Sequence, residues 1–205
     1  NGAGKSTFIN LLLDFATPTE GRVEIFGHDC QTEGVMTRDR IGVLPEGYDV
    51  FERLTGRQHI EYAIESKAVD GDPGEVLDRV GILQDADRQA SDYSKGMAQR
   101  LVLGMALVGE PDLLVLDEPS TGLDPNGAAE MRRIIRAENE RGATVFFSSH
   151  ILEQVEAVAD RIGIMNAGEL VAVDTIEGLR RELDAGARVE LDVEEPAVAQ
   201  RDALD

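Results

Sequence analysis

The first seven residues combine glycine, lysine and hydroxyl side chains in a spacing that suits the binding of phosphate groups. They read Asn1-Gly2-Ala3-Gly4-Lys5-Ser6-Thr7 and run straight into an apolar segment. Glycines let backbone N–H groups turn toward phosphate oxygens, and a helix that starts here adds the positive end of its dipole. The segment matches the latter part of a Walker A loop, in which Lys5 would bind the β- and γ-phosphates and Ser6 would bind Mg²⁺. Taken alone, it would also suit a glycine-rich turn before a helix.

A pair of carboxylates follows an apolar run in the middle of the chain. Leu113–Leu116 is uninterrupted and ends at Asp117 and Glu118, as a buried parallel strand does at its carboxyl end. This fits a Walker B motif, in which Asp117 would hold Mg²⁺ through water and Glu118 would orient and deprotonate the attacking water. For this motif alone, an acidic pair that ends a strand at a solvated loop fits as well.

A histidine follows a second apolar run of the same design. Thr144–Ser148 predicts another strand, and His150 stands just beyond it. Ligands of open α/β sheets bind beyond the carboxyl ends of the strands. We therefore expect His150 to face the same site as Asp117 and Glu118, although a histidine in this place can also be a plain polar cap.

These side chains need a parallel sheet covered by helices to bring them together, and the pattern along the chain predicts one. Short strands are expected at Arg22–Phe26 and Ile41–Leu44, in addition to the two named above. Between Leu54 and Ala90, apolar residues recur at helical spacing, which indicates a helical insert. The fold class is therefore α/β, with strands and helices in alternation.

The C-terminal third predicts a helix over residues 151–159 and then a hairpin. Its two strands, Ile162–Met165 and Leu170–Val173, flank the turn residues 166–168. A further strand is expected at Arg188–Val193, and a helix is expected to begin within Pro196–Leu204.

Composition narrows the class of protein. A chain of 205 residues with 42% hydrophobic content can form one domain with a real core. No stretch reaches the roughly 20 apolar residues of a membrane helix, and the single Cys30 excludes an internal disulfide. We expect a cytoplasmic protein.

The charge is strongly negative. Forty acidic residues against 20 basic ones give −20, which disfavours nucleic acid as a partner. Lysine occurs only at positions 5, 67 and 95. Acidity with so little lysine resembles proteins adapted to a salt-rich cytosol, although a merely solvated acidic surface is the alternative.

Five motifs in order resemble the nucleotide-binding subunits of ABC transporters over essentially the whole chain. They are Asn1–Thr7, Tyr93–Met97, Leu113–Glu118, Gly122–Pro125 and Ser148–His150. The resemblance implies a P-loop NTPase fold with a helical (signature) subdomain. It also implies binding of ATP with Mg²⁺, hydrolysis of the ATP, and head-to-tail closure of a homodimer, or of a pseudo-dimer of two ATPase subunits, over two nucleotides. His150 would be the switch histidine that holds the γ-phosphate and the attacking water.

In that family the signature segment, usually Leu-Ser-Gly-Gly-Gln, caps the γ-phosphate of the ATP bound to the partner subunit. Here Ser94 would supply a hydroxyl and Gly96 a backbone N–H, and Asp124 resembles the D-loop aspartate that contacts the opposite Walker A loop. Three positions depart from the usual motif, namely Tyr93, Lys95 and Met97. This variant resembles the branch whose permeases are exporters of the ABC-2 type. Lys95 would add positive charge near the phosphate, or it is a solvated surface lysine.

The position of the family's Q-loop glutamine is taken by Glu46. A carboxylate can bind Mg²⁺ directly, so metal sensing could persist while hydrogen-bond donation is lost. Tyr48 and Phe51 follow at once, and they suit either the core or a surface that receives the permease. His28 and His59 lack metal-spaced partners and are expected to be ordinary surface or core residues.

The sequence therefore predicts an ATPase subunit that powers a separate membrane permease, at the inner face of the cell membrane. An ATPase of DNA repair or translation and a small-molecule P-loop kinase are the rival classes. The ATPase domain is expected to cover residues 1–184, with the helical subdomain inserted at about 54–105, and residues 185–205 are expected to begin a C-terminal β/α extension. We also expect the strand that leads into the phosphate loop to lie upstream of Asn1, which would leave an unpaired apolar sheet edge.

Overall fold

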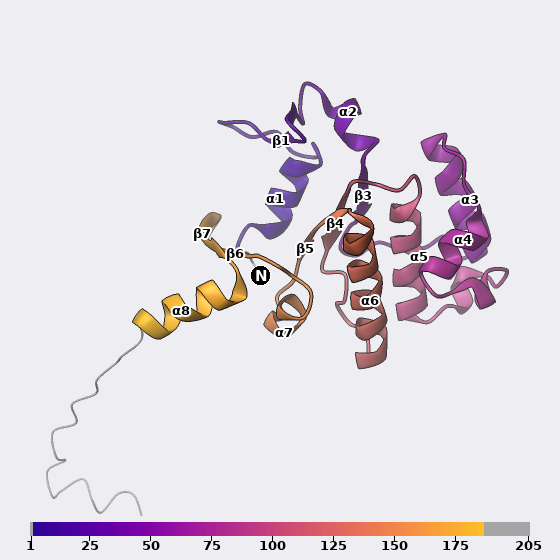
Figure 1. The fold of residues 1–205 in the computed structure, drawn as a ribbon. Helices are drawn as coiled ribbons and strands as arrows, with labels where there is room; N and C mark the ends of the chain where they lie inside the picture. The colour runs from indigo at the N-terminus through magenta and orange to yellow at the C-terminus, as the bar shows by residue number, and fades with distance from the viewer. Residues whose placement is uncertain (1, 187–205) are drawn as a thin grey trace, which may run out of the picture.

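The computed structural model describes residues 2–186, and its core is a parallel sheet of three strands (Figure 1). The strands, in spatial order, are β3 (Ile41–Leu44), β4 (Leu113–Asp117) and β5 (Thr144–Ser148). The register pairs Leu44 with Leu116 and Asp117 with Ser148. The carboxyl ends of the three strands therefore meet at one edge, as expected, and the α/β prediction is confirmed.

The central strand β4 is buried on both of its faces because helices cover both. Leu113 and Val115 pack with Ile9 of α1 (Lys5–Leu12). Leu114 and Leu116 point to the other face and pack with α5 (Lys95–Leu107) and α6 (Pro125–Arg141). Alternate side chains of a strand point to opposite faces, so a continuous apolar run suits this position.

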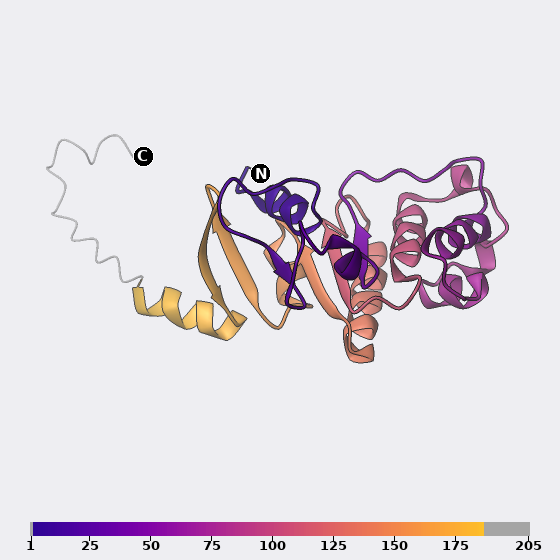
Figure 2. The ribbon, with the colours of Figure 1, turned by 90° about the horizontal axis from the view of Figure 1, so that it is seen from above.

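The helical insert lies on the opposite side of the sheet from α1 (Figures 1 and 2). It contains α3 (Gly56–Lys67), α4 (Pro73–Arg79), two 3₁₀ turns (Leu83–Asp85 and Ala90–Asp92) and then α5. Thr55 begins α3 with a capping box, in which its hydroxyl accepts from the Gln58 N–H and the Gln58 side chain accepts from the Thr55 N–H. Asp72 begins α4 by accepting from the Gly74 N–H at 2.7 Å. The predicted helical insert is confirmed.

The strand expected at Arg22–Phe26 is wrong in its extent. The structure has only β1 (Glu24–Ile25), paired antiparallel with β2 (His28–Asp29), and the short helix α2 (Gly34–Arg38) follows. Phe26 has a φ of 54° and Gly27 a φ of 80°, so the chain reverses there. Two consecutive positive φ values are the conformation of a tight hairpin turn, and a phenylalanine in that position gives no sequence signal for it.

The C-terminal part follows the predicted pattern with two corrections. The helix expected over 151–159 is shorter, since α7 covers Leu152–Glu156. The hairpin is present as β6 (Ile162–Asn166) and β7 (Glu169–Asp174), turning through Ala167 and Gly168 at φ values of 50° and 86°. Helix α8 (Ile176–Gly186) was not expected. The predicted elements at 188–193 and 196–204 lie outside the described residues.

One edge of the sheet carries exposed aromatic surface. Within residues 2–186, β5 pairs with β4 alone, while β6 and β7 form a separate two-stranded sheet. Phe146 of β5 is 37% exposed, and its ring lies 5.7 Å from the ring of Phe8 on α1.

No helix in the described part of the chain has the length and apolar character needed to cross a membrane.

Candidate active site

The phosphate loop depends on glycine at two points. Gly2 has a φ of 87° and Gly4 a φ of 100°, values that favour glycine because it lacks a Cβ. Gly4 also lies against the hairpin turn, where an added Cβ would come within 3.1 Å of the Gly168 Cα. The Gly168 N–H donates to the Ala3 carbonyl at 2.9 Å and so fixes the loop from the side of the hairpin.

The start of α1 offers free donors. Among the described residues, the backbone N–H groups of Lys5, Ser6 and Thr7 have no hydrogen-bond acceptor, as is usual for the first turn of a helix. Ser6 and Thr7 are exposed. A helix start with free N–H groups, preceded by a glycine turn, is a ready site for phosphate oxygens. Asn1 lies outside the described residues.

Glu118 is the centre of the site. Its carboxylate is 7% exposed and lies 3.9 Å from the Lys5 Nζ through Oε1. The other oxygen, Oε2, lies 2.9 Å from the His150 Nδ1 and accepts the Thr121 hydroxyl at 3.0 Å. The structure therefore brings together the three residues that the sequence placed in the Walker A, Walker B and switch motifs. The expectation that Glu118 and His150 face one site is confirmed.

The backbone of Glu118 is unusual. Its φ of 51° is in the left-handed region, which costs a side-chain-bearing residue of the order of 1 kcal/mol. The Glu118 N–H donates to the Ser148 hydroxyl at 3.0 Å, and this contact helps to hold the conformation. Strained backbone of this kind clusters at functional sites, where the surrounding contacts hold a side chain in the position that its function requires.

Ser148 joins the two strands beneath the site. Its hydroxyl donates to Asp117 Oδ1 while it accepts the Glu118 N–H, and all three residues are buried. Neither this role of Ser148 nor that of Thr121 was foreseen. The serine stood in a quoted motif, but only the register of β4 and β5 shows which carboxylate it contacts.

The residues present fit a magnesium ion. The Ser6 hydroxyl and the Asp117 carboxylate are hard oxygen donors, of the kind that Mg²⁺ prefers. Ser148 donates to only one of the two carboxylate oxygens of Asp117. Within residues 2–186 no group of three or more His, Cys, Asp or Glu side chains is placed to hold a metal, so phosphate oxygens and water would have to complete the coordination.

Glu46 lies at the same edge of the sheet but on its exposed rim. It stands two residues beyond the end of β3, in the turn that follows Pro45. Its side chain is exposed. The structure shows no hydrogen bond between Glu46 and the described residues of the phosphate site.

The signature segment (residues 93–97) and the D-loop (residues 122–125) meet each other. Ser94 begins α5 and accepts the Met97 N–H at 3.3 Å, and Asp124 begins α6 and accepts the Gly127 N–H at 2.9 Å. The Lys95 ammonium lies over Gly122, where a Cβ would overlap it. Because α1 and the helical insert are on opposite sides of the sheet (Figure 2), one copy does not bring the signature segment to its own phosphate loop.

Tyr93, the first departure from the usual signature, has a structural reason. Its hydroxyl donates to the Asp85 carbonyl at 2.7 Å and lies so close to Gly56 that a Cβ there would overlap it. Burial raises the pKa of Tyr93. The tyrosine therefore ties the signature segment to the 3₁₀ turn at 83–85, through a contact that leucine could not make.

A groove with aromatic residues on its rim lies beside the turn that carries Glu46. It has a volume of about 280 Å³, and Tyr48, Tyr62, Lys67 and Met105 contribute to its lining. Tyr48 and Phe51 are 38% and 52% exposed, so neither belongs to the buried core. Lys67 is half-buried and donates to the Val108 carbonyl at 2.7 Å, and burial lowers its pKa.

The two other histidines are ordinary, as predicted. His28 lies near the surface with Nδ1 3.3 Å from the Glu33 carboxylate. His59 is fully buried; its Nε2 accepts the Phe51 N–H at 3.0 Å and its Nδ1 lies 2.7 Å from the Thr55 carbonyl. These contacts hold Phe51 against α3.

The fold and the site together define a P-loop nucleotide-binding domain. The sequence model of the family described as "ABC transporter" matches residues 1–121. A solved structure of an ATP-binding subunit of an ABC transporter superposes with a TM-score of 0.79 at 28% identity, covering 91% of this chain and 80% of that one. The chain belongs to the ABC transporter family.

Curated relatives of this chain are ATP-binding proteins of transport or resistance systems. A daunorubicin resistance ATP-binding protein of Streptomyces coeruleorubidus, DrrA3, is 36% identical over 93% of this chain and 62% of its own length. The bacitracin transport ATP-binding protein BcrA of Bacillus licheniformis is 39% identical over 88% of this chain and 60% of its own length. The chain thus spans about three fifths of the length of these relatives.

Proposed function

We propose that the protein is the ATP-hydrolysing subunit of an ABC transporter, and that two copies close over two molecules of ATP to power a separate membrane permease. The observation that carries this proposal is the position of the Glu118 carboxylate between Lys5 and His150. At the carboxyl edge of the sheet, Lys5 is a cation that can bind phosphate, Glu118 is a base that can accept a proton from water, and His150 is a polar side chain beside them.

In this mechanism the phosphate loop, Gly2 to Thr7, binds the phosphates of ATP through its backbone N–H groups, and Asn1 precedes it. Lys5 exchanges its contact with Glu118 for the β- and γ-phosphates. Ser6 and Asp117 would hold Mg²⁺, which neutralises charge on the phosphates when it is bound, and Glu46 would sense it from the turn that follows β3.

Glu118 acts as the general base. It takes a proton from a water molecule whose oxygen attacks the γ-phosphorus, and the bond to the bridging oxygen of ADP breaks. Its protonated carboxyl then returns the proton to solvent. His150 holds the carboxylate through its Nδ1–H at 2.9 Å and presents the rest of its imidazole to the water and the γ-phosphate.

The second half of the site comes from the partner copy. Ser94, Lys95 and Gly96 would contact the γ-phosphate at the start of α5, and Asp124 would contact the opposite phosphate loop. Support comes from their position on exposed helix starts, with the signature segment away from the phosphate loop of the same chain (Figure 2). We assign the ATPase domain to residues 1–184, with the helical subdomain at about 54–105, and the beginning of an extension to 185–205.

The permease would dock on the groove beside Glu46. Aromatic side chains on its rim and an apolar floor suit a short helix of a membrane protein. The protein would then lie in the cytoplasm against the inner face of the membrane, and the net charge of −20 argues against nucleic acid as its partner. The names of the relatives favour export, with a drug-like molecule as cargo.

Two measurements on the full-length protein test the proposal. The purified protein should release phosphate from ATP in the presence of Mg²⁺, and affinity purification from detergent-solubilised membranes should recover a protein with several membrane spans. Recovery of ribosomes or DNA instead, or phosphate transfer to a small molecule rather than water, would contradict it.

A further inference from the structure

Glu138 is a buried carboxylate with no part in the site described above. It lies near the end of α6, is 1% exposed, and accepts hydrogen bonds from two arginines. Arg79, the last residue of α4, donates to it with both Nε, at 2.6 Å, and Nη2. Arg141 donates from one turn further along α6 at 3.1 Å. The Arg79 pair is the only bidentate ion pair between the helical insert and α6 among the described residues.

The contacts continue from Arg79 to the signature segment. The carbonyls of Val80 and Gly81, which follow Arg79 directly, accept the Nη1 of Arg100 at 3.3 and 3.0 Å. The Nε of Arg100 donates in turn to the Gly96 carbonyl at 3.3 Å. A continuous series of polar contacts therefore runs from Glu138 on α6 through the end of α4 to the first turn of α5.

The other end of α6 touches the same segment directly. Asp124 begins this helix, and an added Cβ at Gly96 would lie 3.8 Å from the Leu123 side chain. Fourteen residues at 1.5 Å each separate Asp124 from Glu138, or about 21 Å. The helical insert is thus held to α6 at two points, one at the D-loop and one at Glu138, while α5 packs against both α4 and α6 (Figure 1).

We infer that Glu138 is a positioning residue: through Arg79 and Arg100 it sets the position of the signature segment relative to the D-loop of the same chain. This rests on the proposed function, in which both segments must reach the partner copy's nucleotide together. A misplacement of about 1 Å at such a site can lower the rate about 100-fold.

An ion pair is suited to positioning the signature segment. A gain in stability alone does not explain why the buried pair of Arg79 and Glu138 is present. A buried ion pair is often no more stabilising than a well-packed apolar pair of similar volume, because both charges lose their hydration. What the charged pair adds is direction, since a planar guanidinium meets a carboxylate in one geometry. Replacing the pair with apolar side chains should therefore keep the stability of the fold and remove only the directional contact.

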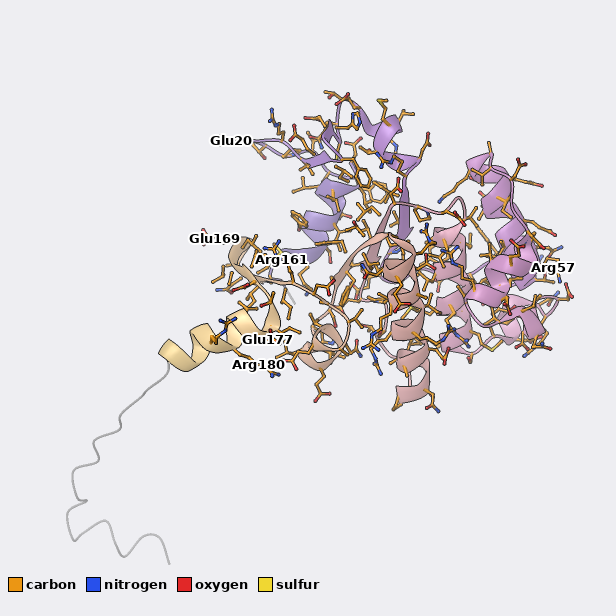
Figure 3. The ribbon with its side chains drawn as sticks, viewed as in Figure 1. Glu20, Arg57, Arg161, Glu169, Glu177 and Arg180 are labelled. Carbon is orange, nitrogen blue, oxygen red and sulfur yellow. The ribbon has the colours of Figure 1, made fainter. Side chains whose placement is uncertain are left out.

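The test is the double variant Arg79→Met/Glu138→Leu in the full-length protein. We expect it to unfold in urea close to the wild type and to bind a fluorescent ATP analogue with a Kd within about twofold, because the phosphate loop is not in the series. The kcat for ATP hydrolysis should fall at least about tenfold. The matched control is Arg57→Met/Asp87→Leu, which removes an exposed ion pair on the outer side of the insert (Figure 3) and should leave all three values unchanged.

A second comparison tests the series of contacts itself. Arg100→Met should lower kcat by a similar factor, and combining it with the double variant should cost little more than either alone, since both break one path. If the triple variant lowers kcat by the product of the two separate factors, the inference is overturned. A folded Arg79→Met/Glu138→Leu protein that hydrolyses ATP like the wild type would overturn it as well. If that protein does not fold, Glu138→Gln, which keeps the shape of the side chain, is measured in its place with the same criteria.

Amide hydrogen exchange without nucleotide separates this inference from the proposed function. The amides of residues 97–100 should exchange faster in the Glu138 variants than in the wild type and the control. Unchanged exchange there would overturn the positioning role, whether or not the wild type hydrolyses ATP. A wild type without ATPase activity but with faster exchange in the variants would refute the proposed function alone.

Discussion

Replacement of Glu118 by glutamine is the sharpest test of the chemistry. The change keeps the shape of the side chain, so the left-handed backbone and the contact of the N–H with Ser148 can remain. It removes the negative charge that now faces Lys5 at 3.9 Å and the base that accepts a proton from water. It also replaces the carboxylate oxygen that accepts from Thr121 and from His150 with a neutral amide.

The expected loss of hydrolysis rate and the expected gain in ATP affinity have different causes and sizes. A positioned general base contributes about 10²–10⁴ in rate, which corresponds to about 3–5 kcal/mol in the activation barrier. The attraction between Lys5 and Glu118 at this distance is about 4 kcal/mol at an effective dielectric constant of 20, before the cost of removing water. Without that competing carboxylate, Lys5 is freer to bind phosphate. Glu118→Gln should therefore hydrolyse ATP at least about 100-fold more slowly and bind it as tightly as the wild type or more tightly.

The assay combines phosphate release at saturating ATP with equilibrium binding of a fluorescent ATP analogue and size-exclusion chromatography with Mg²⁺ and ATP. The variant should accumulate a dimer, because closed pairs are no longer opened by hydrolysis. Hydrolysis within about threefold of the wild type would remove Glu118 from the role of base, since even the low end of the range is 100-fold. Lost binding of ATP would show instead that the carboxylate serves the structure of the phosphate loop.

Four further outcomes follow from particular contacts. Gly42→Ala should lower the free energy of unfolding by about 1–3 kcal/mol in urea titrations, because its Cβ would overlap the Ala106 carbonyl where β3 packs on α5. Tyr93→Phe should cost about 1 kcal/mol through the lost hydrogen bond to Asp85, and an unchanged urea midpoint would contradict this account of the signature tyrosine. Lys95→Gly should weaken dimerisation with ATP in sedimentation experiments, whereas an unchanged dimer constant would identify a solvated surface lysine. Thermal stability of the full protein should rise between low and molar salt, and a flat or falling trend would exclude adaptation of the acidic surface to high salt.

Several elements were predictable because their signals are local. The strand Ile41–Leu44 is a short apolar run between turn-forming residues, and Thr144–Ser148 is another, so both were predicted with their observed bounds. The hairpin around Ala167 was equally clear. The strand expected through Phe26 failed because the turn there has no glycine or asparagine at its first position. The sequence pattern predicts no element at helix α8, although Thr175 accepts the Gly178 N–H in the manner of a helix start.

The sequence by itself determined which side chains could do chemistry, because the spacing of Lys5, Asp117 and His150 within their motifs reflects local backbone requirements. The order of the strands also predicts that His150 faces the same site as Asp117 and Glu118, but only the tertiary structure decided which side chains touch. Ser148 reaches Asp117 across 31 residues of sequence, and Arg79 reaches Glu138 across 59. Such contacts depend on strand register and on the packing of helices, and these are set by how apolar faces from distant segments fit together. A single sequence does not encode that fit in any short pattern.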